Sequence, residues 1–297
     1  MDAELFTEWQ RRQGHKVIHT SSSYWHEAGP RVFQAFPYKW LIKPSEQELN
    51  HLLVDHGVLA VRYSTPVSAD QGKVSYHLVI DGSYDMEQVH KKTRKHVSSG
   101  LSQCTIQEIP LSLFTDTGWH LQLDTLKRQG RTRSMNKNKW EVMSKAAEGI
   151  PGIEAWGAFV NGQLAAALLT ALIDDTCYTL YSLSLQEYME KYVNHALFYS
   201  ATREMLQREG INSIFYTVQS LDAPKSVDDF KFRMGFQAVP VRQRVVFHPL
   251  FRPFVNHLSH RVISWLLRKD PGSALLAKGE GMIRFYLQGK QPLLQQE

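Results

Sequence analysis

The densest group of charged side chains lies in a predicted helix, "DMEQVHKKTRKHVSSG", that ends at Gly100. Two interpretations of this basic helix stay open. A run of charges is usually a solvated surface. It can also bind an anion, either on the acceptor end of a tRNA or on an acceptor substrate with a carboxylate or phosphate. The side chains concerned are Lys91, Lys92, Arg94, Lys95 and His96.

A second basic pair, Lys231 and Arg233, lies within "FKFRMGF". We predict a short helix from Asp228 to Met234, a left-handed stop at Gly235 and a strand that follows. The pair either faces an anion or forms a surface-exposed basic turn. Three rings are expected to anchor this corner: Phe230, Phe232 and Phe236.

A metal site is not expected. His15 and His19 have the spacing of two zinc ligands on a helix. No glutamate follows as in HExxH, and the flanking "VIHTSSS" is typical of an extended segment.

The composition is that of an ordinary globular protein, with 43% hydrophobic and 21% charged residues among 297, which excludes a disordered chain. The net charge of +5 fits a phosphate-bearing ligand, an RNA or an anionic membrane surface. Cys104 and Cys177 form no CxxC motif, so we predict a reducing compartment with both thiols buried. We expect a cytoplasmic location, because the N-terminus lacks an apolar signal region and "LAAALLTALI" is shorter than the roughly 20 residues of a bilayer span.

The hydrophobic pattern predicts an α/β protein with mixed sheets. In the first half we expect a helix at 43–57 with a capping box at Ser45 and Glu48, strands at 58–65 and 73–82, the basic helix, and a strand at 104–109. Next come helices at 115–130 and 140–149. Asn161-Gly162 predicts a hairpin. The remaining elements are three antiparallel strands at 153–160, 163–173 and 176–184, a helix at 193–210, a strand at 211–220, the short helix, a strand at 236–249 and an amphipathic helix at 253–269.

From Trp140 to Pro249 this order resembles the GNAT superfamily of acyltransferases. The tandem form is closer still, because FemAB-like peptidyltransferases and related acetyltransferase-like domains carry K-x-R-x-x-V/I in the first half and F-K-x-x-x-G-F in the second. Here these motifs are Lys92–Val97 and Phe230–Phe236. The resemblance implies two GNAT-like units in tandem, at 1–115 and 116–249, and a helical extension at 250–297.

The resemblance also implies a mechanism: an amine attacks the donor carbonyl directly, without a covalent enzyme intermediate. Positioning of the two reactants supplies roughly 7–11 kcal/mol of the barrier, and one oxyanion donor about 2.7–4 kcal/mol. In the family this donor is a backbone N–H on a splayed strand, here near Leu183. Tyr181 and Tyr216 would border the opening beside it, either as a proton donor and acceptor guide or as packed core residues.

The family's acyl carrier, acetyl-CoA or another acyl-CoA, places its pyrophosphate at a helix N-terminus. The matching positions are Lys191, Tyr192, Val193 and Asn194, and Lys231 would face a carrier phosphate. In GNAT acetyltransferases a Q/R-x-x-G-x-G/A motif lies here, whereas "LQEYMEKYVNHA" has no glycine. Asn194 and Lys191 could therefore be only a helix cap and a solvated side chain. Acceptor binding is assigned to Lys92, Arg94 and Arg233.

Three functions stay open: acyl transfer from acyl-CoA to a small-molecule amine, aminoacyl transfer from tRNA as in FemAB proteins, and a catalytically silent binding module. The long heptads of FemAB proteins with a coiled-coil arm are absent. No stable membrane insertion is expected. The tail helix with Trp265 either packs on the second unit or lies on a membrane surface.

Overall fold

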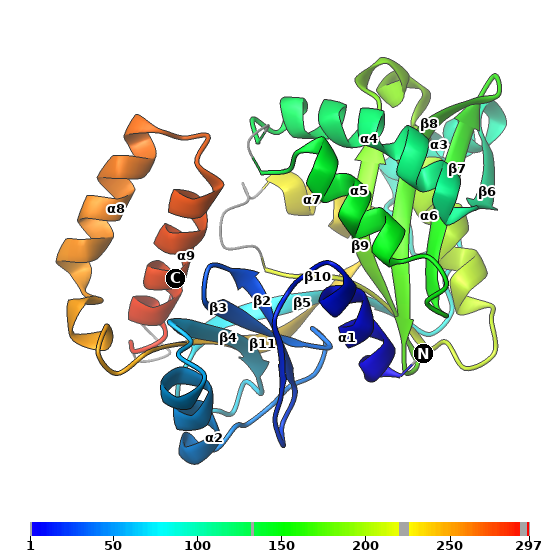
Figure 1. Ribbon diagram of the computed structural model, residues 1–297. Coiled ribbons are helices and arrows are strands. Elements are labelled where there is room, and N and C mark those ends of the chain that lie inside the picture. The colour runs from blue at the N-terminus through cyan, green and yellow to red at the C-terminus, as the bar shows by residue number, and fades with distance from the viewer. Residues whose placement is uncertain (1, 132–133, 220–225, 292–295, 297) are drawn as a thin grey trace. The chain divides into compact units, whose positions relative to one another are not determined.

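The structure is a computed structural model that describes residues 2–131, 134–219, 226–291 and 296. The chain forms two compact units (Figure 1). Unit 1 comprises Met1–Gln13, Leu78–Thr217 and Pro224–Gln237, and unit 2 comprises Gly14–His77, Val218–Ala223 and Ala238–Glu297. The predicted α/β class is confirmed. The division at 115/116 and 249/250 follows sequence order and stays a prediction, and residues 292–295 and 297 of the proposed extension lie outside the described residues.

Unit 1 contains five strands of the sheet in the order β10-β9-β8-β7-β6. The pairs β6/β7, β7/β8 and β8/β9 are antiparallel, and β9/β10 is parallel. The predicted hairpin turn is confirmed, since Asn161 and Gly162 have φ of 50° and 79°. The strands are β6 (Thr105–Ile109), β7 (Ile153–Val160), β8 (Gln163–Ile173), β9 (Thr176–Ser184) and β10 (Ser213–Val218).

Helices cover this sheet. Helices α4 and α5 lie in front of the strands in Figure 1, and α6 lies behind them. Trp140 of α5 is fully buried, and its indole N–H donates to the Thr115 carbonyl of α4 at 2.9 Å. The helices are α3 (Lys91–Gln103), α4 (Leu111–Arg128), α5 (Lys137–Ala146), the 3₁₀ helix η2 (Gln186–Lys191), α6 (Val193–Leu206) and α7 (Ser226–Arg233).

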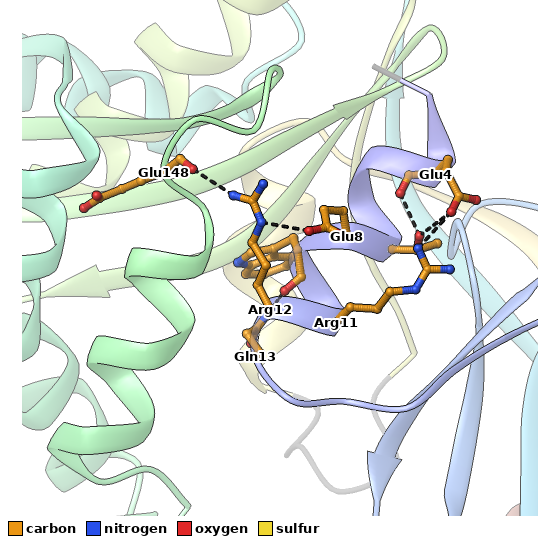
Figure 2. Close-up of polar contacts among 8 residues, drawn as sticks. Glu4, Glu8, Arg11, Arg12, Gln13 and Glu148 are labelled. Carbon is orange, nitrogen blue, oxygen red and sulfur yellow. Dashed lines mark hydrogen bonds and ion pairs between the residues drawn. The ribbon is translucent and has the colours of Figure 1, made fainter.

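An amphipathic helix that the hydrophobic pattern did not predict, α1 (Ala3–Arg12), also belongs to unit 1. Figure 2 shows how its polar side chains hold it. The Arg12 guanidinium donates to the Glu148 carbonyl at 3.1 Å and to Glu8 at 3.0 Å. On the buried side, the Trp9 indole donates to the Met143 carbonyl at 2.9 Å. The N-terminal segment is thus tied to α5 and the turn after it.

Unit 2 contains five strands in the order β1-β2-β3-β4-β11. Only β3/β4 among these pairs is parallel within the described residues. The three N-terminal strands were missed because short strands around a Gly-Pro turn leave little periodicity. The strands are β1 (Val17–His19), β2 (Tyr24–Gly29), β3 (Val32–Phe36), β4 (Ala60–Thr65) and β11 (Gln237–Phe247), and the boundary between the units falls inside β5 (Lys73–Asp81).

The predicted helix at 43–57 is present as α2 (Glu46–Asn50) continued by the π-helix η1 (His51–Asp55). The Ser45 hydroxyl accepts from the Glu48 N–H at 3.1 Å, as a helix cap does. The tail begins with the 3₁₀ helix η3 (Arg252–Phe254) and holds two helices where one was predicted, α8 (His257–Lys269) and α9 (Ala274–Gln288).

Helix α8 packs on α9 and leaves Leu258, Val262 and Trp265 exposed. Within the described part of the chain, no helix has both the length and the apolar character needed to cross a bilayer.

Candidate active site

The most distinctive feature of unit 1 is the early end of the pairing between β9 and β10. The ladder comprises three residue pairs in the described structure and ends at Tyr178 and Phe215, although both strands continue. The register of β9 with β8 shifts between Thr179 and Tyr181, which leaves Leu180 as an extra residue. A β-bulge bends its strand and re-aims the side chains beside it. Strand β9 therefore changes course next to the point where β10 stops pairing with it.

Tyr181 follows this bulge directly. Its ring is partly exposed and meets the ring of Trp140 edge to face at 6.2 Å. No residue in the described part of the chain forms a hydrogen bond with its hydroxyl. Burial of the ring raises the pKa of Tyr181 to about 12. The hydroxyl is therefore protonated at neutral pH and open to a ligand.

Tyr216 lies on β10 and packs toward a different helix from Tyr181. Its ring stacks on Phe198 of α6 at 5.3 Å and meets Phe236 edge to face at 5.2 Å. Lys231 places its ammonium 4.7 Å from the centre of the Tyr216 ring. The two tyrosines thus pack against α5 and α6 respectively.

Lys231 is only 5% exposed, so the interpretation of a solvated basic turn does not apply to this residue. The predicted corner is confirmed: the Phe236 N–H donates to the Lys231 carbonyl at 3.1 Å, and Gly235 has φ of 97°. Phe232, however, is 42% exposed, so it is less buried in the corner than expected. Burial of an ammonium group costs free energy unless anions or aromatic faces compensate it. Lys231 therefore places an unusual, buried positive charge beside β10.

The amides near Leu183 point in alternate directions. The Leu185 N–H donates to the Ala165 carbonyl of β8 at 2.9 Å, and Leu183 pairs with Ala167. Residues two apart on a strand point the same way, so the Leu183 N–H also faces β8. The Leu183 donor stays a prediction. The same alternation directs the Ser182 amide toward the side of β10.

Ser184 closes the end of β9 with polar contacts to α4 and α6 that the sequence did not reveal. Its N–H donates to the Thr125 hydroxyl at 3.1 Å. Arg128 donates to its carbonyl at 3.3 Å and to its hydroxyl at 3.0 Å. Asn194 donates to the same hydroxyl at 3.0 Å. The i,i+3 spacing of Thr125 and Arg128 on a helix was the only available signal.

The N-terminus of α6, where a carrier pyrophosphate was predicted, packs against α3. Tyr192 adopts a left-handed conformation with φ of 55°, and its ring stacks on His96 at 4.3 Å. A Cβ on Gly100 would lie 2.7 Å from the Tyr192 carbonyl oxygen, so the two helices touch backbone to backbone. His195 meets both rings edge to face, and its pKa is lowered to about 4 by burial and by His96.

The remaining predicted carrier residues have local roles in the fold. Val193 is fully buried, and only Lys191 is a partly exposed cation. Asn194 does not cap α6, since the helix starts at Val193 and the N-cap position is Tyr192. The Asn194 amide instead reaches back to Ser184, and its side-chain oxygen is buried without a partner in the described structure. Their role in binding a carrier stays a prediction.

The predicted acceptor residues come together from two elements. The His90 N–H, at the start of α3, donates to the Arg233 carbonyl at the end of α7 at 2.9 Å. Lys92 and Arg233 are exposed. Arg94 is held by the Val89 and Glu87 carbonyls at 2.9 and 2.8 Å, so it braces the turn before α3. Lys91 and Lys95 are exposed beside them, which gives a cationic surface.

The predictions for cysteine and metal have mixed outcomes. Cys177 is buried, which raises the pKa of its thiol, whereas Cys104 is only half-buried. His19 ends strand β1, so it cannot pair with His15 on a helix. No group of three or more metal-ligating side chains occurs in the part of the chain that the structure describes.

Comparison with known proteins gives structural relatives only. No family model and no curated protein matches the sequence. The crystal structure of FemX matches with a TM-score of 0.57 and 11% identity, over 84% of this chain and 92% of FemX. The chain has the fold of FemX.

Two further structures share this fold. The C-terminal domain of a putative lysylphosphatidylglycerol synthetase from Agrobacterium fabrum matches with a TM-score of 0.53 and 11% identity, over 81% of this chain and 87% of that domain. L-PGS from Bacillus licheniformis matches with a TM-score of 0.50 and 9% identity, over 83% of this chain and 91% of that chain. At these identities the likeness shows the fold.

Proposed function

We propose that unit 1 transfers an acyl group to an amine, and that the activated carbonyl enters where β9 and β10 stop pairing. The observation that carries this proposal is the ladder end at Tyr178, next to the bulge at Leu180. The amine attacks the carbonyl carbon and forms the new C–N bond. The bond to the leaving oxygen or sulfur then breaks, the leaving atom gains a proton, and the amine nitrogen loses one.

Tyr181 is proposed to protonate the leaving atom. A general acid must hold its proton at the working pH and lie close to the leaving atom. The raised pKa of Tyr181, about 12, meets the first condition, and its hydroxyl, which binds no other described residue, can meet the second. A leaving alkoxide binds a proton strongly, so even this weak acid can protonate it. A leaving thiolate needs a proton less, because its parent thiol has a pKa of about 8.5.

Lys231 is proposed to stabilise the negative charge that develops on the carbonyl oxygen. Its ammonium is buried beside Tyr216, where a charge acts more strongly than it does in water. The Ser182 amide, directed toward the side of β10, is the proposed backbone donor in place of Leu183.

Of the two donors, the site favours an aminoacyl ester of tRNA over acyl-CoA. Bound acyl-CoA would need the backbone N–H groups at the N-terminus of α6, and α3 crowds this end of the helix through Gly100 and the His96–Tyr192 stack. The exposed cations on α3 fit the phosphates of an RNA. The FemAB resemblance supports this choice.

The test compares the two donors directly. Calorimetric titration with acetyl-CoA should give no heat, whereas aminoacyl-tRNA should bind with an affinity that falls steeply as salt rises. The double variant Lys92→Ala with Lys95→Ala should weaken RNA binding, and Lys145→Ala, which removes an exposed cation on α5, should not. Saturable binding of acetyl-CoA with unchanged RNA affinity in the double variant would contradict the donor assignment.

A catalytically silent binding module is the second candidate, and the absent glycine motif before α6 favours it. Turnover that disappears in Tyr181→Phe excludes this candidate. Ligand binding without any product, for every donor and amine tested, would support it instead.

A further inference from the structure

Unit 2 contains a pocket of about 280 Å³ that none of the proposed chemistry uses. Its wall comes from β11, the turn at 70–72, η3 and the end of α9. Gly72 and Gly289 bring two backbone segments together there, and the Gly72 N–H donates to the Gly289 carbonyl at 3.1 Å. A Cβ on Gly289 would lie 2.9 Å from the Lys73 nitrogen, so a larger residue would displace the wall. The charged lining residues are Glu46, Asp70, Arg244, Arg252 and Lys290.

One buried hydroxyl in the wall has no partner. Tyr286 is 8% exposed, and its hydroxyl forms no hydrogen bond within the part of the chain that the structure describes. The ring is fixed by an edge-to-face contact with Phe247 at 5.2 Å, and the Lys290 ammonium lies 4.0 Å from the ring centre. Buried hydroxyls in folded proteins nearly always have a partner, so this one is available to a ligand atom.

The charges of the wall favour a small anion. Arg244 is partly neutralised by Glu46 at 3.4 Å. Arg252 is exposed, and no described residue accepts a hydrogen bond from its guanidinium. Together with Lys290, the wall has three cations against two carboxylates, an excess of one positive charge.

The size of the pocket limits the ligand further. Pockets for drug-sized molecules range from roughly 300 to 1,000 Å³, so this volume suits a small metabolite or a headgroup rather than a nucleotide. A phosphate group offers several acceptor oxygens to cations that approach from different elements.

We propose that this pocket binds a single phosphate group, carried by a small phosphate ester or by a phospholipid headgroup. Arg252 and Lys290 neutralise the phosphate, and the Tyr286 hydroxyl donates a hydrogen bond to one of its oxygens. The second source is included because Leu250 and Phe254, which flank Arg252 in the chain, are 73% and 71% exposed. Apolar side chains around a cation are typical of contact with a lipid surface.

The experiment uses the full chain and two probes. Glycerol 3-phosphate is titrated by calorimetry, with glycerol as the uncharged control ligand. Binding to vesicles of phosphatidylglycerol is measured by co-sedimentation, with phosphatidylcholine vesicles, which carry no net charge, as the control. The variants are Arg252→Gln and Tyr286→Phe, and the control is Arg268→Gln, an exposed cation on α8 that does not line the pocket.

We expect one of the probes to bind, with about tenfold weaker affinity in Arg252→Gln and about three- to tenfold weaker affinity in Tyr286→Phe. Tyr286→Phe should leave the thermal midpoint unchanged or raise it, because it removes a buried hydroxyl without a partner. If the Tyr286 hydroxyl had only a structural role, its removal would not weaken binding while leaving the thermal midpoint unchanged or raised. Binding of glycerol 3-phosphate assigns a free phosphate ester, and binding of the anionic vesicles alone assigns a headgroup. No binding of either probe, or equal binding by the variants and the wild type, would overturn the proposal.

Discussion

The contact between α3 and α6 can be tested without any substrate, by adding one methyl group. In Gly100→Ala the new Cβ would lie 2.7 Å from the Tyr192 carbonyl oxygen and 3.0 Å from the Ala196 Cβ. Real Cβ atoms do not approach a backbone oxygen so closely, so the two helices must separate. Alanine is itself favoured over glycine in a helix by about 0.8–1 kcal/mol. Overpacking a tight contact costs about 1–3 kcal/mol.

With the overpacking penalty at its upper end, Gly100→Ala should destabilise the protein by about 2 kcal/mol. One kcal/mol corresponds to about 2–4 °C in a chain of 150–250 residues, so we expect a thermal midpoint about 4–8 °C lower. The control is Gly279→Ala in the interior of α9, where the new Cβ would meet only Ile263, at 3.8 Å. Because alanine has the higher helix propensity and meets no close contact here, Gly279→Ala should raise the thermal midpoint by about 2–4 °C.

The measurement is thermal unfolding followed by circular dichroism at 222 nm. If Gly100→Ala is as stable as Gly279→Ala, α3 does not cover the N-terminus of α6. The backbone N–H groups of that helix would then be open to a carrier pyrophosphate, and acyl-CoA would again be a candidate donor. A Gly100→Ala protein that is destabilised but gains affinity for coenzyme A would show that α3 blocks the site.

Three further outcomes follow from the site. Tyr181→Phe should lower turnover about 10²-fold or more with an unchanged unfolding midpoint, whereas Tyr188→Phe, whose hydroxyl binds Gln163, should leave turnover unchanged; equal losses would contradict the assignment. Lys231→Met keeps the apolar stem and should lower kcat about 10²–10³-fold, and a normal kcat would remove Lys231 from the mechanism. The pKa of His195 is lowered to about 4. The neutral side chain therefore contributes to the stability of the fold above pH 6.5, and this contribution is lost as the pH falls toward 4. His195→Asn should therefore flatten the fall in unfolding midpoint between pH 6.5 and 4, and an unchanged slope would exclude that burial effect.

Local patterns were sufficient for the second half of the fold. The Asn-Gly turn at 161–162 and the glycine stop at Gly235 fix backbone conformations that few other residues adopt, so the strands on either side followed. Helix α1 was missed, because its burial depends on partners far away in the chain. Trp9, for example, is held by a hydrogen bond to Met143 across 134 positions.

The candidate site was predictable only where it lies in a motif. The corner around Lys231 was located from "FKFRMGF", but its burial under Tyr216 was not, since a charged residue in a short helix is usually solvated. The packing of α3 on the start of α6 includes a stack between the rings of His96 and Tyr192, and no spacing rule links residues so far apart in the sequence. The bulge at Leu180 is a register shift, and register is set by pairing rather than by composition.

Acyl transfer at the end of the β9/β10 ladder is tested most directly by following a labelled acyl group. The protein is incubated with a panel of amines and either aminoacyl-tRNA or acetyl-CoA, each carrying the label on the acyl carbon, and the products are separated by mass. We predict that label moves from aminoacyl-tRNA to an amine and that this transfer is lost in Tyr181→Phe. Label transferred only from acetyl-CoA, or transferred equally well by Tyr181→Phe, would contradict the account.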